Sequence, residues 1–166
     1  MLKKGVGSQF RTPGLLACDA MNELGSAPVF QRALVLDTNI VLDLFVFADE
    51  AAGPVRAALE SGGLRWLATQ AMRDELERVL AYTQIVPRLA FYELAAGDVL
   101  AAFDRHSEQV DVPVKAPVTC KDPDDQKFID LAVAHGAMLL SKDRAVLALK
   151  KRLESLSVRA GATLHA

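Results

Sequence analysis

Four acidic side chains in this sequence have the type and the placement needed to hold a divalent cation. Asp37 and Asp143 each come directly after a short apolar run that is typical of a buried strand. Glu75 and Asp125 lie in the first turns of two predicted helices, where each can face inward. Carboxylates within a few ångströms of one another repel, and Mg²⁺ or Mn²⁺ relieves that repulsion. Such an ion can activate water and stabilise charge on a phosphodiester under attack.

Polar neighbours of these acids are expected to support the site. Thr38 and Asn39 follow Asp37, and both residue types can end a strand and cap the helix after it. Lys142 precedes Asp143, so its ammonium group could contact a phosphate. Solvation at the surface is the competing fate for this lysine.

Each acid also has a structural alternative. Asp122 suits the N-cap of a helix whose first residue is Pro123, and a water could link it to a metal. Asp125 would then stand three residues after the cap and could complete a capping box. Glu75 could be a solvated helix acid, and Asp143 could cap the next helix. Asp37 is different, because no local role requires an acid after a buried strand.

A further acid, Asp43, lies among apolar residues of the first predicted helix. We expect it to pair with a neighbouring side chain rather than bind metal, because a buried carboxylate needs a partner.

The elements that must position these residues alternate between strand and helix. Strands are predicted at 33–36, 64–68 and 137–140, with weaker candidates at 110–114 and 157–163. Helices are predicted after Thr38, at 55–60, after Thr69, over 87–103 with an interruption near Gly97-Asp98, from Asp122 to about His135, and after Asp143. This alternation predicts a three-layer α/β/α fold with a mostly parallel central sheet of four or five strands. The carboxyl ends of such strands meet at one edge, which would gather the four acids.

Composition narrows the class of protein. The 166 residues are enough for one domain, which we place at 32–166 after a loosely held arm at 1–31, with Met21 as a candidate initiator. The net charge of −2 provides no general attraction for a polyanion, so a nucleic acid would have to be drawn by local cations or metal. Cys18 and Cys120 form neither a disulfide framework nor a zinc motif, which favours a reduced, cytoplasmic setting. No apolar run reaches membrane-spanning length.

Taken together, four segments resemble the PIN domain family. They are VLDTN at 35–39, RDELERVL around Glu75, DPDDQKFIDLAVAHGA at 122–137 and LLSKDRAVL at 139–147. The likeness is closest to the bacterial branch of toxin components related to VapC, and it covers about residues 32–150. Single motifs such as DTN are weak, whereas the four in this order and spacing are specific.

The resemblance implies a Mg²⁺- or Mn²⁺-dependent endoribonuclease with Asp37, Glu75, Asp125 and Asp143 as its acidic quartet. It also implies an RNA substrate, a cognate antitoxin protein and, in some members, a homodimer. The apolar helical surface from Pro87 to Phe103 is the expected place for an antitoxin helix. The carboxyl-terminal SVRAGATLHA departs from the family, whose members often end in a strand, a proline and a short helix.

Two other functions remain open at this point. A catalytically silent PIN-like module could bind RNA or support assembly without needing the four acids. A phosphatase could use Asp37 as a nucleophile, but it would want a second acid two residues later, where Asn39 stands.

Overall fold

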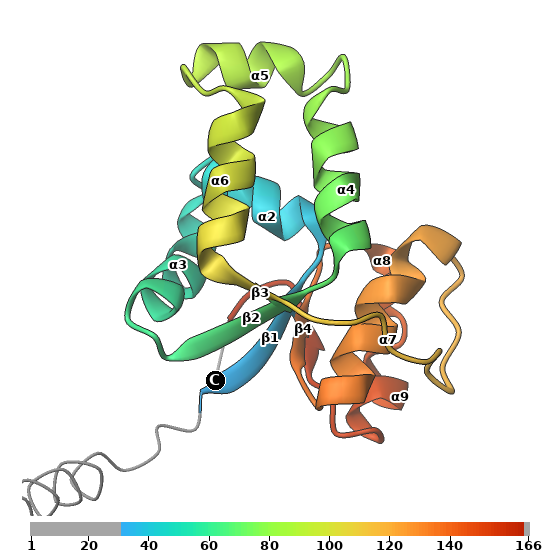
Figure 1. Ribbon diagram of the computed structural model, residues 1–166. Coiled ribbons are helices and arrows are strands. Elements are labelled where there is room, and N and C mark those ends of the chain that lie inside the picture. Colours follow the sequence, from blue (N-terminus) through green and yellow to red (C-terminus); the bar gives the residue numbers. More distant parts are fainter. Residues whose placement is uncertain (1–30, 165–166) are drawn as a thin grey trace, which may run out of the picture. The chain divides into compact units, whose positions relative to one another are not determined.

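The computed structural model describes residues 31–164, which form a parallel five-stranded sheet flanked by helices (Figure 1). The strands are β1 (Arg32–Leu36), β2 (Leu64–Ala68), β3 (Ser107–Gln109), β4 (Met138–Leu140) and β5 (Ala160–Gly161). Their order across the sheet is β3-β2-β1-β4-β5, and every neighbouring pair is parallel. The predicted α/β/α architecture with a parallel sheet is confirmed.

The strand order creates a switch point between β1 and β4. From β1 the chain builds outward through β2 to β3, and then returns to place β4 on the other side of β1. Loops after β1 and β4 therefore leave the sheet side by side, and their helices depart in different directions. This is where ligands of open α/β sheets bind, and Asp37 and Asp143 lie in these two loops.

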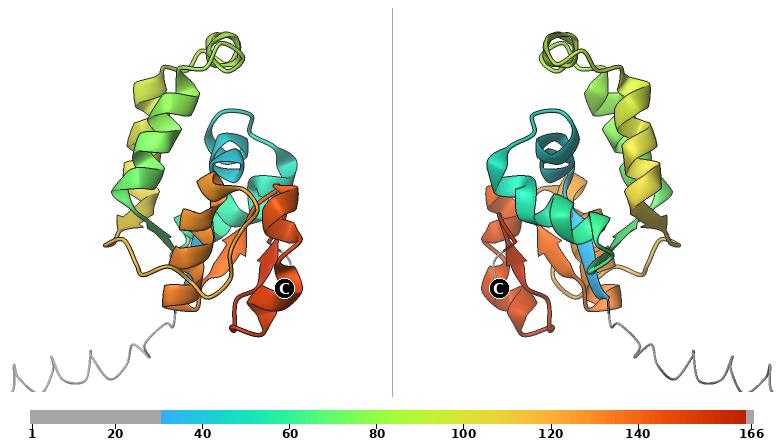
Figure 2. Two further views of the ribbon diagram at one scale, coloured as in Figure 1. Left: turned by 90° about the vertical axis from the view of Figure 1, so that its right-hand side faces the viewer. Right: turned by 90° about the vertical axis from the view of Figure 1, so that its left-hand side faces the viewer.

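Helices cover both faces of the sheet. They are α2 (Thr38–Phe45), α3 (Gly53–Glu60), α4 (Gln70–Leu80), α5 (Val86–Phe91), α6 (Ala96–His106), α7 (Gln126–His135), α8 (Arg144–Leu147) and α9 (Lys150–Glu154), with 3₁₀ turns η1 (Glu50–Ala52) and η2 (Pro123–Asp125). The helices α4 and α6 stand side by side, and α5 lies across their far end (Figures 1 and 2). None of the described helices is long and apolar enough to cross a membrane.

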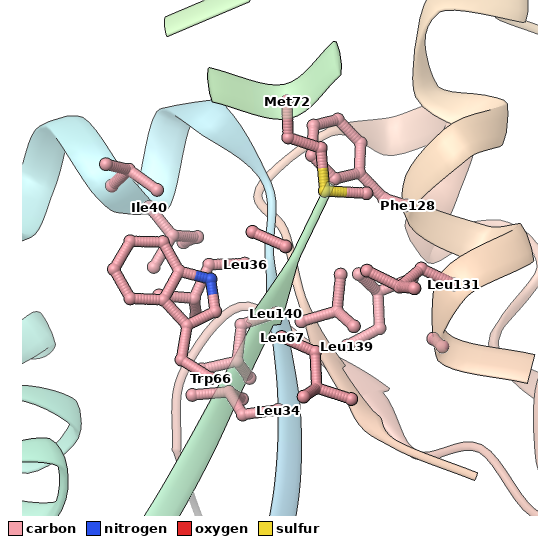
Figure 3. Packing of buried hydrophobic residues seen from close by; sticks show 14 of the residues in the cluster. Leu34, Leu36, Ile40, Trp66, Leu67, Met72, Phe128, Leu131, Leu139 and Leu140 are labelled. Atoms are coloured by element: carbon pink, nitrogen blue, oxygen red, sulfur yellow. The ribbon is translucent and has the colours of Figure 1, made fainter. Parts of the chain in front are cut away.

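The core is divided by the sheet into two apolar layers. In β2, Trp66 and Leu67 point to opposite faces, as successive strand residues must. Trp66 faces Ile40 of α2, whereas Leu67 lies with residues that pack toward α7 (Figure 3). The Trp66 indole also meets Phe103 of α6 edge-to-face, with ring centroids 4.8 Å apart. Both layers anchor the helices that carry the acids.

Three predicted boundaries were wrong. Residues 110–114 are not a strand: β3 ends at Gln109, Val112 is exposed, and the last bond to β2 runs from the Val110 N–H to the carbonyl of Ala68, where β2 ends. The break in the helical region falls between α5 and α6 rather than at Gly97-Asp98, because the Asp98 carboxylate accepts the Ala95 N–H and so starts α6. The last strand covers only two residues of the predicted 157–163. The predicted arm, apart from Gln31, lies outside the described residues.

Candidate metal centre

Asp37 directly follows β1 and occupies the N-cap position of α2, where the residue is only 5% exposed. Its Oδ2 accepts a hydrogen bond from the Ser141 hydroxyl at 2.5 Å, and its backbone N–H donates to the Leu140 carbonyl at 2.9 Å. Burial raises the pKa of Asp37 above its ordinary value of 3.8, and the hydrogen bond from Ser141 opposes that effect. The β1–β4 switch point thus holds a carboxylate that is costly to ionise without a cation.

Asp125 is the most perturbed acid of the site. It is the last residue of η2, 8% exposed, and its Oδ2 is fully buried with no hydrogen-bond partner among residues 31–164. Burial is the main cause that raises its pKa to about 7, and the charges of Asp37, Asp143 and Asp122 add to it. The capping-box alternative is wrong, because Asp125 makes no side-chain capping bond; Asp122 caps the turn by accepting the Asp124 N–H at 3.0 Å.

Three carboxylates form a tight group at this edge of the sheet. One oxygen from each of Asp122, Asp125 and Asp143 lies within 4.8 Å of the other two. Asp143 also caps α8, accepting the Ala145 N–H at 2.7 Å through Oδ1. The cap occupies one of its two carboxylate oxygens, so its role as a cap is compatible with a role as a ligand.

Glu75 lies on α4 and is tied to other groups than these three aspartates. Its Oε2 accepts a hydrogen bond from the Thr38 hydroxyl at 2.5 Å, and its Oε1 pairs with the Lys127 ammonium at 2.9 Å. These contacts join α4 to the starts of α2 and α7. The prediction that Glu75 faces inward agrees with its position, and its charge is one of the causes that raise the pKa of Asp37.

The predicted supporting residues divide into two groups. Thr38 contacts the site through Glu75, and the Asn39 side chain accepts the Lys142 backbone N–H at 3.4 Å, linking the loops after β1 and β4. The Lys142 ammonium instead pairs with Asp43 and, at 3.6 Å, with Asp49. The expected side-chain partner of Asp43 is therefore found, and the same pair directs the Lys142 charge toward α2 and η1.

Two side chains that contact the acids, Ser141 and Lys127, were not among the predicted site residues. Ser141 is fully buried, and its hydroxyl both donates to Asp37 and accepts the Asp143 N–H at 3.0 Å. Lys127 follows Asp125 by two residues and pairs with an acid 52 positions away. The one signal in the sequence was a place next to an acid, and it pointed to Lys142, which directly precedes Asp143.

The donor set fits a hard divalent cation. Apart from the Lys127 ammonium, which pairs with Glu75, the charged groups that converge here are carboxylates, which Mg²⁺ and Mn²⁺ accept together with water. The buried Asp125 Oδ2 has no partner among the described residues, and the acids around it raise its pKa. A cation would satisfy that oxygen and lower the repulsion at once.

The raised pKa of Asp125 predicts a pH dependence for the metal-free protein. Because this carboxyl has a folded pKa of about 7 against 3.8 when unfolded, the folded state binds the extra proton between these values. The free energy of unfolding should therefore be highest at pH values near the unfolded pKa of 3.8. It should fall, by on the order of a few kcal/mol, as the pH rises to the folded pKa of about 7. Urea unfolding in EDTA at several pH values measures this. Asp125→Asn should flatten the curve, and an equal slope in both proteins would contradict the assignment.

Comparisons with known proteins concern the family and the fold of the chain. The family model described as PIN domain matches residues 33–145. Among solved structures, the chain is similar to VapBC2 from Rickettsia felis bound to a DNA fragment from their promoter, with a TM-score of 0.52 and 13% sequence identity over 77% of this chain and 98% of that one. At this identity the likeness concerns the fold. No curated protein matches the chain.

Proposed function

The chain belongs to the PIN domain family, and from this we propose that it is a metal-dependent endoribonuclease and the toxin of a type II toxin–antitoxin pair. PIN domains are generally nucleases. The single observation that carries the proposal for this chain is the buried Asp125 oxygen, which has no hydrogen-bond partner within residues 31–164 and lies beside two further carboxylates. That arrangement is unfavourable without a cation and suits one well.

The residues divide the work by position. Asp125 and Asp143 would hold Mg²⁺ or Mn²⁺ together with Asp122, which lies in the same tight group, and Asp37 is near enough for its charge to act on Asp125 and to complete the set. A bound ion would lower the pKa of a water molecule and stabilise charge on the phosphate. Ser141 orients Asp37 by donating to one of its oxygens. The remaining member of the quartet is Glu75. The Thr38 hydroxyl orients its carboxylate by donating a hydrogen bond to Oε2.

RNA is the proposed substrate, and its attraction must be local. The chain carries a net charge of −2, so long-range attraction of a polyanion is weak. A divalent cation at the acid edge would offset much of the local negative charge and could bind a phosphate oxygen directly.

Metal dependence is the first test. RNA cleavage by the purified protein should require added Mg²⁺ or Mn²⁺ and stop in EDTA, because the proposed ligands are all oxygen atoms. Cleavage is measured on a labelled RNA, with metal content followed by elemental analysis. The control restores activity by adding excess metal to the chelated sample. Undiminished cleavage by protein confirmed to be metal-free would refute the mechanism.

The antitoxin proposal predicts a growth phenotype. The similar Rickettsia structure is a VapBC2 complex, and here an apolar tip of Tyr82, Val86, Phe91 and Tyr92 is exposed at the end of α4 and around α5. We expect expression alone to slow growth and the small protein encoded beside it to restore growth. Phe91→Glu should weaken that rescue while sparing RNA cleavage, since Phe91 is 78% exposed and ends α5, a helix that carries none of the four acids.

A matched control is available on another surface. Val114 is 85% exposed on the segment after β3, so Val114→Glu introduces the same charge outside the tip and should leave rescue intact. If the chain proves harmless when overproduced as an active nuclease, the toxin assignment is lost and the nuclease assignment remains.

A further inference from the structure

Lys127 is a cation fixed at the margin of the acid edge. It lies in the first turn of α7, and its ammonium pairs with Glu75 Oε1 at 2.9 Å. The same ammonium donates to the Asp124 carbonyl and lies 4.9 Å from the centre of the buried Phe128 ring. Three partners of different kinds hold it, and the Lys127 side chain is 27% exposed. Its position is therefore determined by packing and not only by attraction to one acid.

Glu75 has both carboxylate oxygens engaged in this arrangement. Oε1 takes the lysine and Oε2 takes the Thr38 hydroxyl. The tight group of three carboxylates does not include Glu75. Among the site acids, Glu75 is thus the one whose charge is met by an ammonium group of the protein.

The acids at this edge divide into two groups, each of which could bind a cation. Asp122, Asp125 and Asp143 lie close enough to share one divalent ion, with Asp37 near enough to raise the pKa of Asp125. Glu75 would remain as the acid available to a second ion. Carboxylate-rich sites of this kind can hold two metals. Here the ammonium of Lys127 already pairs with Glu75.

We propose that Lys127 takes the place of a second metal at Glu75, so that the site binds a single divalent ion. The inference rests on the proposed metal-dependent function and specifies its stoichiometry. Lys127 is in these terms a positioning residue: it neutralises Glu75 and keeps that carboxylate turned toward Thr38. Removing the ammonium should free Glu75 Oε1 for a divalent cation. Without Lys127 the Glu75 carboxylate would be repelled by the neighbouring acids, and a bound cation would relieve that repulsion.

Counting bound Mn²⁺ tests this directly without relying on activity. Metal-free protein is titrated with Mn²⁺, and the free ion is followed by its electron paramagnetic resonance signal. We expect one bound Mn²⁺ in the wild type and two in Lys127→Met. The double variant Lys127→Met/Glu75→Gln should return to one, because the acid that accepts the second ion is gone.

Two further variants separate local pairing from general charge. Lys121→Met removes a positive charge from an exposed lysine close to Asp122 in the sequence and should stay at one Mn²⁺. Lys127→Gln provides a second removal of the ammonium if the methionine variant folds poorly. Two ions in the wild type, or one ion in both ammonium-removed variants, would overturn the proposal. A wild type that binds no Mn²⁺ would instead refute the metal centre itself.

Discussion

Replacing Asp125 with asparagine should lower the rate of RNA cleavage by roughly 10³-fold or more while the metal-free protein stays folded. The carboxylate is 8% exposed and one of its oxygens has no partner among the described residues. Its charge stabilises nothing that the metal-free fold needs, and three nearby aspartates oppose it. At or above neutral pH the variant should therefore unfold at the same temperature as the wild type or a higher one. Labelled-RNA cleavage and thermal unfolding in EDTA are the measurements.

The adjacent acid supplies the control. Asp124 is exposed and precedes Asp125 in η2, so Asp124→Asn makes the same chemical change one position away and should leave both quantities unchanged. Asp122→Ala should cost about 1 kcal/mol of stability by removing the cap on η2. A larger loss of rate from Asp124→Asn than from Asp125→Asn would show that the wrong residue of DPDD had been chosen.

Asp37→Asn is expected to remove cleavage to a comparable extent, again without destabilising the metal-free fold. Asparagine can still accept the Ser141 hydroxyl through its amide oxygen, so the contact between the β1 and β4 loops survives. What is lost is a charge that burial makes unfavourable, since burial is the main cause of the raised Asp37 pKa. The same two assays, carried out beside the wild type, measure the effect.

Asp43 offers a comparison within the same helix. It is also buried, at 8% exposed, but its carboxylate pairs with Lys142. Asp43→Asn should therefore show the reverse pattern, with modestly lowered thermal stability and retained cleavage, because the Asp43 side chain, 12% exposed, loses its ion pair with Lys142. The loss should be modest, since Lys142 is 43% exposed and keeps Asp49 as a second partner. Clear destabilisation by Asp37→Asn would mean that Asp37 has a structural role instead of a catalytic one.

Local patterns in the chain were sufficient to place three of the four acids. Asp37 and Asp143 follow apolar runs that cannot be anything but buried, and parallel strands bring their carboxyl ends to one edge. Asp125 follows a cap and a proline that start a helix, so its place in the first turn could be read from neighbouring residues. Each of these inferences depends on residues within one element and one rule of sheet topology.

The predicted strand at 110–114 was wrong because its pairing depends on residues far away in the chain. Residues 110–114 have the alternation of a strand, but pairing with β2 stops at the start of that segment, because the Val110 N–H already bonds the carbonyl of Ala68, the last residue of β2. Register between two strands depends on how far the intervening helices α4, α5 and α6 carry the chain. A short window of sequence does not contain that length.

Which side chains meet across elements depended on the folded arrangement. Ser141 reaches Asp37 across 104 positions, and Lys127 reaches Glu75 across 52. Lys142 was the more obvious cation beside Asp143, yet its ammonium turns to Asp43. Side-chain direction at a loop or a helix start is set by packing against other elements, so the acids could be assigned from their own surroundings in the chain, whereas their partners became known only once the helices were docked on the sheet.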